Sequence, residues 1–183
     1  MQLESNDPLT LLLKSKGLQD WGALSDFVKN IPYGRNENRT DFSLVIKEHQ
    51  GTCSSKHAFL KKVAELNQLD HIELILGMYK MSETNTPKIG KQLTSNNLSY
   101  IPEAHCYLKI AGKRVDLTNA TSAIEPIEKD ILEELNIRPQ QVATFKVNYH
   151  QTYLKEWIKS EKLPMSFEKV WAIRELCIAN LTE

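Results

Sequence analysis

The chain contains 183 residues, of which 41% are hydrophobic and 25% are charged, and its 23 lysines and arginines are matched by 23 aspartates and glutamates. This length fits one domain, or one domain with a small helical appendage, and is enough to bury a core. The balanced charge gives no reason to expect a nucleic acid or an anionic membrane surface as a partner. No apolar run reaches the roughly 18 residues of a membrane-spanning helix, and the segment from Met1 to Asp7 lacks the basic and apolar regions of a secretory signal.

The cysteines indicate a reducing compartment. Cys53, Cys106 and Cys177 form an odd set without a short repeated spacing, which favours free thiols over a disulfide framework. We therefore expect a cytoplasmic protein without a cofactor or a metal. A zinc site is the competing chemistry, but no Cys-x-x-Cys or His-x-x-x-His pair is present. The side chains that could serve such a site are His49, Cys53, His57, His105 and Cys106.

The N-terminal part is predicted to form one or two helices that pack against the core. Leucines follow Pro8 closely, and apolar residues then recur at helical spacing between residues 21 and 28. Asp20 suits the N-cap position, and Pro32 stops the pattern. The polar, turn-rich segment 33–41 follows and is predicted to be a surface loop.

A further helix is predicted from Cys53 to about Gln68, because apolar residues recur there at helical spacing. Gly51 and Thr52 precede it, and the Thr52 hydroxyl suits the N-cap. Cys53 therefore lies at a helix start, where unpaired N–H groups make the end electropositive. A thiol in that position ionises more easily than a free one, and the thiolate is the nucleophilic form. The alternative is that Cys53 is an unreactive packing residue.

The middle of the chain predicts strands. Residues 71–81 are expected to form a buried strand, and residues 82–99, rich in Thr, Asn and Ser, a long loop. Residues 104–110 and 114–118 alternate on either side of an Ala-Gly-Lys turn at 111–113, which predicts a β-hairpin.

Two side chains of this hairpin are candidates for chemistry. His105 lies near the start of its first strand and Asp116 near the end of its second. The two positions are symmetric about a turn centred between Ile110 and Ala111, so we expect them to face each other within reach of an imidazole–carboxylate hydrogen bond.

The C-terminal part is predicted to contain a helix, a strand and two closing helices. Their expected ranges are Ile127 to Leu135, Val142 to Tyr149, Tyr153 to Glu161 and Ser166 to about Leu181. Cys177 falls on the apolar face of the last helix and is expected in the core.

Acyl transfer through a thioester needs a thiolate that attacks, a base that takes and returns the proton, and a group that holds the base in its working tautomer. Cys53, His105 and Asp116 can supply these functions in that order. The backbone N–H of Cys53, at a helix start, can also stabilise an oxyanion.

With these residues the chain resembles the transglutaminase-like superfamily, whose core carries a Cys-His-Asp triad in this order. The matching stretches are Gly51-Thr52-Cys53 with the helix after it, the strand 71–81, Glu103 to Ile110 and Arg114 to Thr118. The resemblance covers about residues 50 to 120. It implies an α+β, cysteine-protease-like fold, in which the nucleophile helix packs on an antiparallel sheet between flanking N- and C-terminal helices.

The resemblance also assigns roles: Cys53 is the nucleophile, His105 the general base and Asp116 the orienting acid. Gln50 is a candidate for a second oxyanion donor by proximity. His57 lies on the same helix face as Cys53, and we expect it at the surface or behind the site rather than as the base.

Members of the superfamily include cross-linking transglutaminases, peptidases, peptide N-glycanases and amidases. The resemblance therefore implies a thiol-dependent hydrolase or acyltransferase that acts on a peptide, a protein or a small amide or ester. A catalytically inactive module that binds a peptide or protein partner is the alternative. We expect one transglutaminase-like domain, residues 1–183, with a core at about 30–150 and helical extensions at 1–30 and 150–183.

Overall fold

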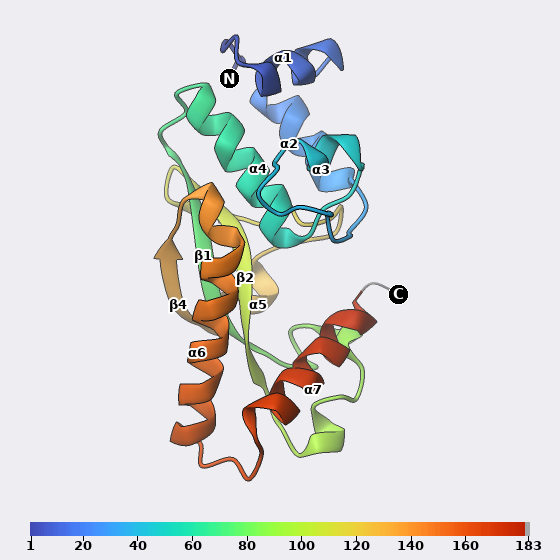
Figure 1. The fold of residues 1–183 in the computed structure, drawn as a ribbon, viewed down its shortest axis with the longest axis vertical. Coiled ribbons are helices and arrows are strands. Elements are labelled where there is room, and N and C mark those ends of the chain that lie inside the picture. The colour runs from blue at the N-terminus through green and yellow to red at the C-terminus, as the bar shows by residue number, and fades with distance from the viewer. Residues whose placement is uncertain (182–183) are drawn as a thin grey trace. The chain divides into compact units, whose positions relative to one another are not determined.

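The computed structural model describes residues 1–181 and shows an α+β protein, as the sequence predicts (Figure 1). The sheet is four-stranded and antiparallel, with the strand order β3-β2-β1-β4. The strands are β1 (Ile72–Met81), β2 (Ile101–Ile110), β3 (Lys113–Val115) and β4 (Ile131–Asn136). The predicted strand at 71–81 and the predicted hairpin are thus confirmed as elements.

The helices are α1 (Pro8–Ser15), α2 (Trp21–Asn30), α3 (Leu44–Lys47), α4 (Cys53–Leu66), α5 (Glu125–Glu128), α6 (Thr144–Ser160) and α7 (Phe167–Asn180). Short 3-10 turns are η1 (Pro87–Ile89), η2 (Thr94–Asn96) and η3 (Pro139–Val142). The segment 82–99 is irregular apart from η1 and η2, as predicted.

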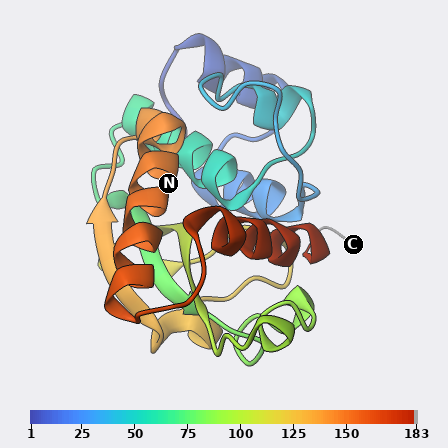
Figure 2. The ribbon, with the colours of Figure 1, turned by 60° about the horizontal axis from the view of Figure 1, so that its bottom comes forward.

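The chain divides into two compact units. Unit 1 consists of residues 1–76, 106–124 and 135–143, and unit 2 consists of residues 77–105, 125–134 and 144 onward. Strands β1 and β2 each contribute residues to both units. Within unit 1, α1, α3 and η3 pack against α4, and within unit 2, α7 packs against α6 and η1. Figure 2 shows α7, in red, following α6 in the chain.

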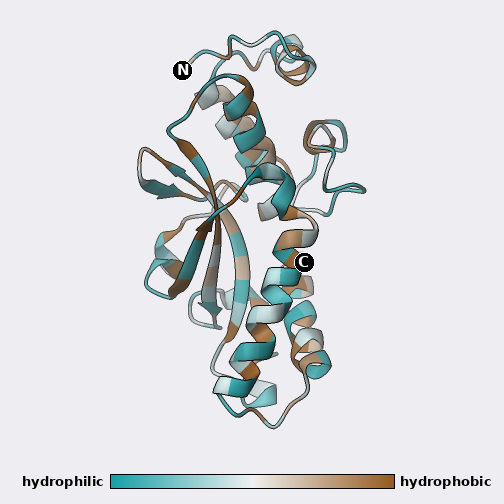
Figure 3. Cartoon of the chain, turned by 60° about the vertical axis from the view of Figure 1, so that its left-hand side comes forward, coloured by the Kyte–Doolittle hydropathy of each residue, from teal (hydrophilic) through white to brown (hydrophobic). Residues whose placement is uncertain are grey.

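Side-chain caps confirm three predicted helix starts. Asp20 accepts a hydrogen bond from the Ala23 N–H at 3.0 Å, and Ser166 accepts one from the Lys169 N–H at 3.3 Å. Thr52 caps α4. Each cap satisfies a backbone donor that a helix start leaves unpaired. Hydrophobic and hydrophilic positions are interleaved along the helices (Figure 3), as expected for helices that bury one side.

The helix predicted from Ile127 to Leu135 is wrong, because α5 ends early and β4 occupies the rest. Backbone hydrogen bonds tie both ends of β4 to β1. At one end the Lys80 N–H donates to Asp130 O at 3.0 Å, and at the other the Ile137 N–H donates to Leu74 O at 2.9 Å. Pairing with a distant strand thus overrides the helical preference of the local Leu and Glu residues.

The strand predicted from Val142 to Tyr149 is also wrong, because α6 begins at Thr144 and runs to Ser160, where it covers all but the last residue of the helix predicted at 153–161. Phe145 and Tyr149 satisfied the alternating pattern, but they also lie one helical turn apart. Their rings stack with centroids 6.1 Å apart and planes at 19°. The buried residues of α6 follow helical spacing and are His150, Leu154 and Trp157.

A buried ion pair holds β2 to α7 in unit 2. Arg174 donates from Nε to Glu103 Oε2 at 2.7 Å and from Nη2 to Glu103 Oε1 at 2.5 Å. His150 Nε2 donates to Pro102 O at 2.9 Å and lies 3.8 Å from Glu103 Oε2. Burial acts to raise the pKa of Glu103, but the positive charge of Arg174, followed by that of His150, lowers it to about 2.

Glu103→Gln is expected to lower the free energy of unfolding by about 3 kcal/mol at neutral pH, because the Arg174 charge stays buried without its counter-ion. The pKa of Glu103 is about 2 in the folded protein, against an ordinary value of 4.5. Its stabilisation is therefore complete above the ordinary pKa and is lost as pH falls through the folded value.

Urea unfolding of both proteins between pH 2 and 7 measures this difference, which should shrink below pH 4.5. The exposed Glu4→Gln exchange is the control. Equal losses in the two variants would contradict the prediction.

Candidate active site

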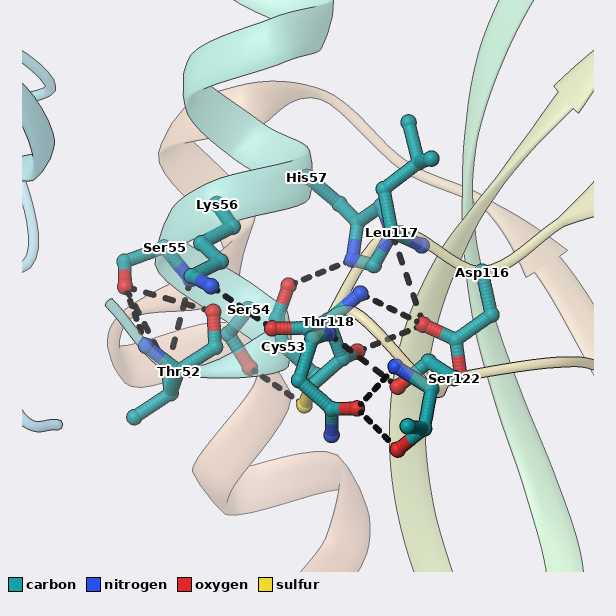
Figure 4. Close-up of polar contacts among 12 residues, drawn as sticks. Thr52, Cys53, Ser54, Ser55, Lys56, His57, Asp116, Leu117, Thr118 and Ser122 are labelled. Atoms are coloured by element: carbon teal, nitrogen blue, oxygen red, sulfur yellow. Dashed lines mark hydrogen bonds and ion pairs between the residues drawn. The ribbon is translucent and has the colours of Figure 1, made fainter. Parts of the chain in front are cut away.

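Cys53 is the first residue of α4, and a reciprocal cap fixes it there. The Ser55 N–H donates to Thr52 Oγ1 at 3.3 Å, and the Thr52 N–H donates to Ser55 Oγ at 2.8 Å (Figure 4). The predicted Thr52 N-cap is therefore confirmed. Cys53 is 9% exposed, and its Sγ lies 3.8 Å from Ser54 Oγ. The cap thus holds a nearly buried thiol at the positive end of a helix.

Gly51 permits the close approach that precedes this helix. A Cβ at position 51 would come within 2.7 Å of Lys56 Cγ and 3.1 Å of Ser55 Oγ, so a larger residue does not fit without a shift. The Gly51 N–H donates to Pro32 O at 3.1 Å, and Gly51 O accepts from the Gly34 N–H at 3.3 Å. The entry to α4 is therefore fastened to the loop after α2.

Gln50, the predicted second oxyanion donor, also contacts this loop. Its Nε2 donates to Arg35 O at 2.9 Å. Its side-chain amide is thus engaged by a backbone carbonyl in the same unit.

His57 is fully buried, and both of its ring nitrogens contact backbone groups. Nε2 accepts a hydrogen bond from the Leu117 N–H at 2.8 Å, and Nδ1 lies 2.7 Å from Cys53 O. A backbone N–H can only donate, so Nε2 carries no proton and Nδ1 donates to the carbonyl. In this arrangement the ring is neutral and in one tautomer, and the lone pair of Nε2 is engaged by the Leu117 N–H. The surface position considered for His57 is wrong; the side chain lies in the core.

Asp116 lies in unit 1 with Cys53 and is 9% exposed. Its Oδ1 accepts hydrogen bonds from the Thr118 N–H at 2.9 Å and from Thr118 Oγ1 at 2.6 Å (Figure 4). The same oxygen is 3.7 Å from His57 Nε2. That nitrogen also accepts the Leu117 N–H, and the backbone and hydroxyl of Thr118 hold the carboxylate oxygen in this position.

Lys56 is a buried cation that the sequence reasoning missed. It is 0% exposed, and its Nζ donates to Ile31 O and, at 2.7 Å, to Thr118 O. Burial lowers the pKa of Lys56 to about 8, against the opposing effect of the Asp116 charge. A signal existed, because Lys56 lies on the same helical stripe as the buried Leu60 and Val63.

His105 lies on β2, at the end of a stretch that belongs to unit 2. Its ring approaches that of Tyr79 edge to face, with centroids 6.3 Å apart and planes at 73°. The structure thus assigns Cys53 and Asp116 to one unit and His105 to the other. The convergence of all three side chains stays a prediction.

The hairpin register differs from the predicted one. Leu108 pairs with Val115 and Ile110 with Lys113, which centres the turn between Ala111 and Gly112 rather than one residue earlier. Both turn residues have positive φ, 48° and 80°, as a two-residue turn of this hand requires. Asp116 therefore follows the last residue of β3 and is not the ladder partner of His105.

Comparisons of the chain with protein-family models, with curated proteins and with solved structures found no match. Among residues 1–181, no helix is long and apolar enough to cross a membrane. Over the same residues, no group of three or more His, Cys, Asp or Glu side chains is arranged to hold a metal ion.

The burial of Lys56 predicts a pH-dependent stability. Its pKa is about 8 in the folded protein, against an ordinary value of 10.5. Between these pH values the unfolded chain binds a proton that the folded chain does not, so the unfolding free energy rises with pH. Relative to Lys56→Met, the wild type should gain about 3 kcal/mol over this interval.

Urea unfolding at pH 7.5 to 10.5 checks this, with the exposed Lys16→Met as the control. If the difference between wild type and Lys56→Met is constant across the interval, the prediction fails.

Proposed function

We propose that this protein is a thiol-dependent hydrolase or acyltransferase with a transglutaminase-like core. Cys53 is the nucleophile, His105 the general base and Asp116 the acid that orients His105. The observation that carries the proposal is the start of α4, where a cysteine occupies the first residue of a capped helix. The carboxylate of Asp116 lies in the same unit, on a segment hydrogen-bonded to that helix.

The proposed reaction begins when His105 takes the thiol proton and the Cys53 thiolate attacks an amide or ester carbonyl. The carbonyl oxygen becomes an oxyanion that the backbone N–H of Cys53 stabilises. The tetrahedral intermediate collapses, the C–N or C–O bond breaks, and His105 returns the proton to the leaving amine or alcohol. Water or an amine then attacks the thioester, with His105 as base, and releases the acyl group from Cys53.

The fixed tautomer of His57 supports a base on another element. His57 is the histidine of α4 one turn from Cys53, yet its two nitrogens bind Leu117 N–H and Cys53 O. We therefore place the base elsewhere in the chain. His105 is the histidine to which the superfamily resemblance assigns this role.

The substrate class follows from the chemistry alone: a peptide, a protein or a small amide or ester. Cys53, Cys106 and Cys177 are all free thiols. Free thiols fit a reducing compartment, so we propose that the reaction takes place in the cytoplasm.

A catalytically inactive binding module is the second candidate, and the contact of Gln50 favours it. With the Gln50 amide held by Arg35 O, the proposed second oxyanion donor is engaged in the loop. The absence of one such donor costs about two to three orders of magnitude in rate.

Thiol labelling tests the nucleophile. Iodoacetamide at pH 7 should modify Cys53 at least about tenfold faster than Cys177, because a helix N-terminus favours the thiolate. Cys177 is fully buried, and burial raises its pKa to about 11, so it serves as an internal reference. Peptide mapping by mass spectrometry measures both rates. A Cys53 rate no greater than that of Cys177 would count heavily against a nucleophilic role.

Acyl-enzyme trapping tests turnover. Activated esters and amides should add an acyl mass to the wild type and none to Cys53→Ala. In His105→Ala the acylation rate should fall by about two to four orders of magnitude, because the general base is missing. Intact-mass spectrometry at timed intervals measures this. If labelling of Cys53 is fast but no substrate acylates it, the binding module is the better assignment.

A further inference from the structure

We propose that His57 and Lys56 are positioning residues that fasten the segment carrying Asp116 to the first two turns of α4. Cys53 and Asp116 then move as one rigid piece. The catalytic consequence of this inference rests on the proposed function, whereas the fastening itself is a property of unit 1.

His57 forms the first link, between the backbone of Cys53 and the backbone of Leu117, the residue after Asp116. Its Nδ1 donates to the carbonyl of Cys53 itself, at 2.7 Å. Its Nε2 accepts the N–H of Leu117, the residue directly after Asp116, at 2.8 Å. One buried ring therefore spans the gap between the proposed nucleophile and the proposed acid (Figure 4).

Lys56 forms the second link, one residue further along the segment. Its ammonium donates to Thr118 O at 2.7 Å and also to Ile31 O, at the end of α2. Thr118 in turn donates two hydrogen bonds to Asp116 Oδ1. The two links therefore hold the backbone on the C-terminal side of Asp116, and Thr118 passes that constraint on to the carboxylate.

The chemical cost of Lys56 indicates a purpose other than stability. The buried Lys56 ammonium loses hydration that its two carbonyl contacts and the charge of Asp116 only partly replace. An apolar side chain of similar length could fill the space on the stripe of Leu60 and Val63 without that penalty. The need to fix the positions of two backbone carbonyls explains why Lys56, a charged hydrogen-bond donor, stands here instead of an apolar residue.

The first experiment measures the links directly and needs no substrate. In the wild type, the Leu117 amide should exchange slowly with solvent, and the 15N shifts of the His57 ring should show Nδ1 protonated and Nε2 not. Rapid exchange at Leu117, or a proton on Nε2, would overturn the inference.

Matched variants then test the hydrogen bonds at Nδ1 and at Nε2 of His57 separately. His57→Gln places an acceptor near the position of Nε2 and should keep the Leu117 amide protected. His57→Asn keeps a donor near Nδ1 but does not reach Leu117, so the protection of the Leu117 amide against exchange should fall at least about tenfold. This is the factor expected when a hydrogen bond worth about 1.4 kcal/mol is lost. The exposed His71→Asn is the control. Unchanged protection in His57→Asn would overturn the inference.

Kinetics test the catalytic consequence. With an ester that acylates the wild type, His57→Asn should lower kcat about tenfold or more with little change in KM, and His57→Gln should restore most of it. Lys56→Met should lower kcat in the same way. A wild-type kcat in both His57→Asn and Lys56→Met would overturn the positioning role.

The outcomes keep the two proposals apart. If no substrate acylates the wild type, the proposed enzyme is wrong, and amide exchange at Leu117 still tests the fastening. If the wild type is acylated normally but the Leu117 amide exchanges rapidly, the fastening is wrong and the proposed enzyme is retained.

Discussion

The burial of the first two turns of α4 is the constraint on which the candidate site depends. From Cys53 to Leu60 every residue is buried, although the stretch includes two serines, a lysine and a histidine. Buried polar groups without partners cost free energy, so the chain around the helix must supply acceptors and donors. The loop after α2 and the segment after β3 do so with backbone carbonyls and an N–H. The paths of both segments are therefore tied to side chains of a single helix.

The two units treat buried charge differently. In unit 2 the Arg174 guanidinium forms a bidentate salt bridge with the Glu103 carboxylate, which keeps Glu103 ionised and joins β2 to α7. In unit 1 the Lys56 ammonium meets two neutral carbonyls and keeps a lowered pKa. Removing one partner of the first pair leaves a buried charge without its counter-ion, whereas the second cation is desolvated among backbone carbonyls. The strand held by Glu103 is also the strand that carries His105, two residues further on.

Elements whose conformation depends on neighbouring residues are predictable from the sequence, whereas elements that depend on distant contacts are not. Asp20, Thr52 and Ser166 were found as caps because a cap acts within one turn of its helix. The β4 segment was misread as a helix because its conformation depends on β1, which lies far away in the sequence. The start of α6 was misread as a strand because Phe145 and Tyr149 satisfy a period of two as well as one helical turn. The hairpin was found, but its register depended on which two residues accept positive φ.

By itself the sequence determined the α+β class, the helix start at Cys53, and the order of a thiol, an imidazole and a carboxylate along the chain. Only the tertiary structure decided that Lys56 and His57 lie in the core, which tautomer His57 adopts, and which backbone groups hold the segment of Asp116. The physical reason is that propensity, capping and periodicity are properties of neighbouring residues. The partners of a buried polar group are chosen by the whole fold, because only the fold decides which distant carbonyl or N–H comes within hydrogen-bonding distance.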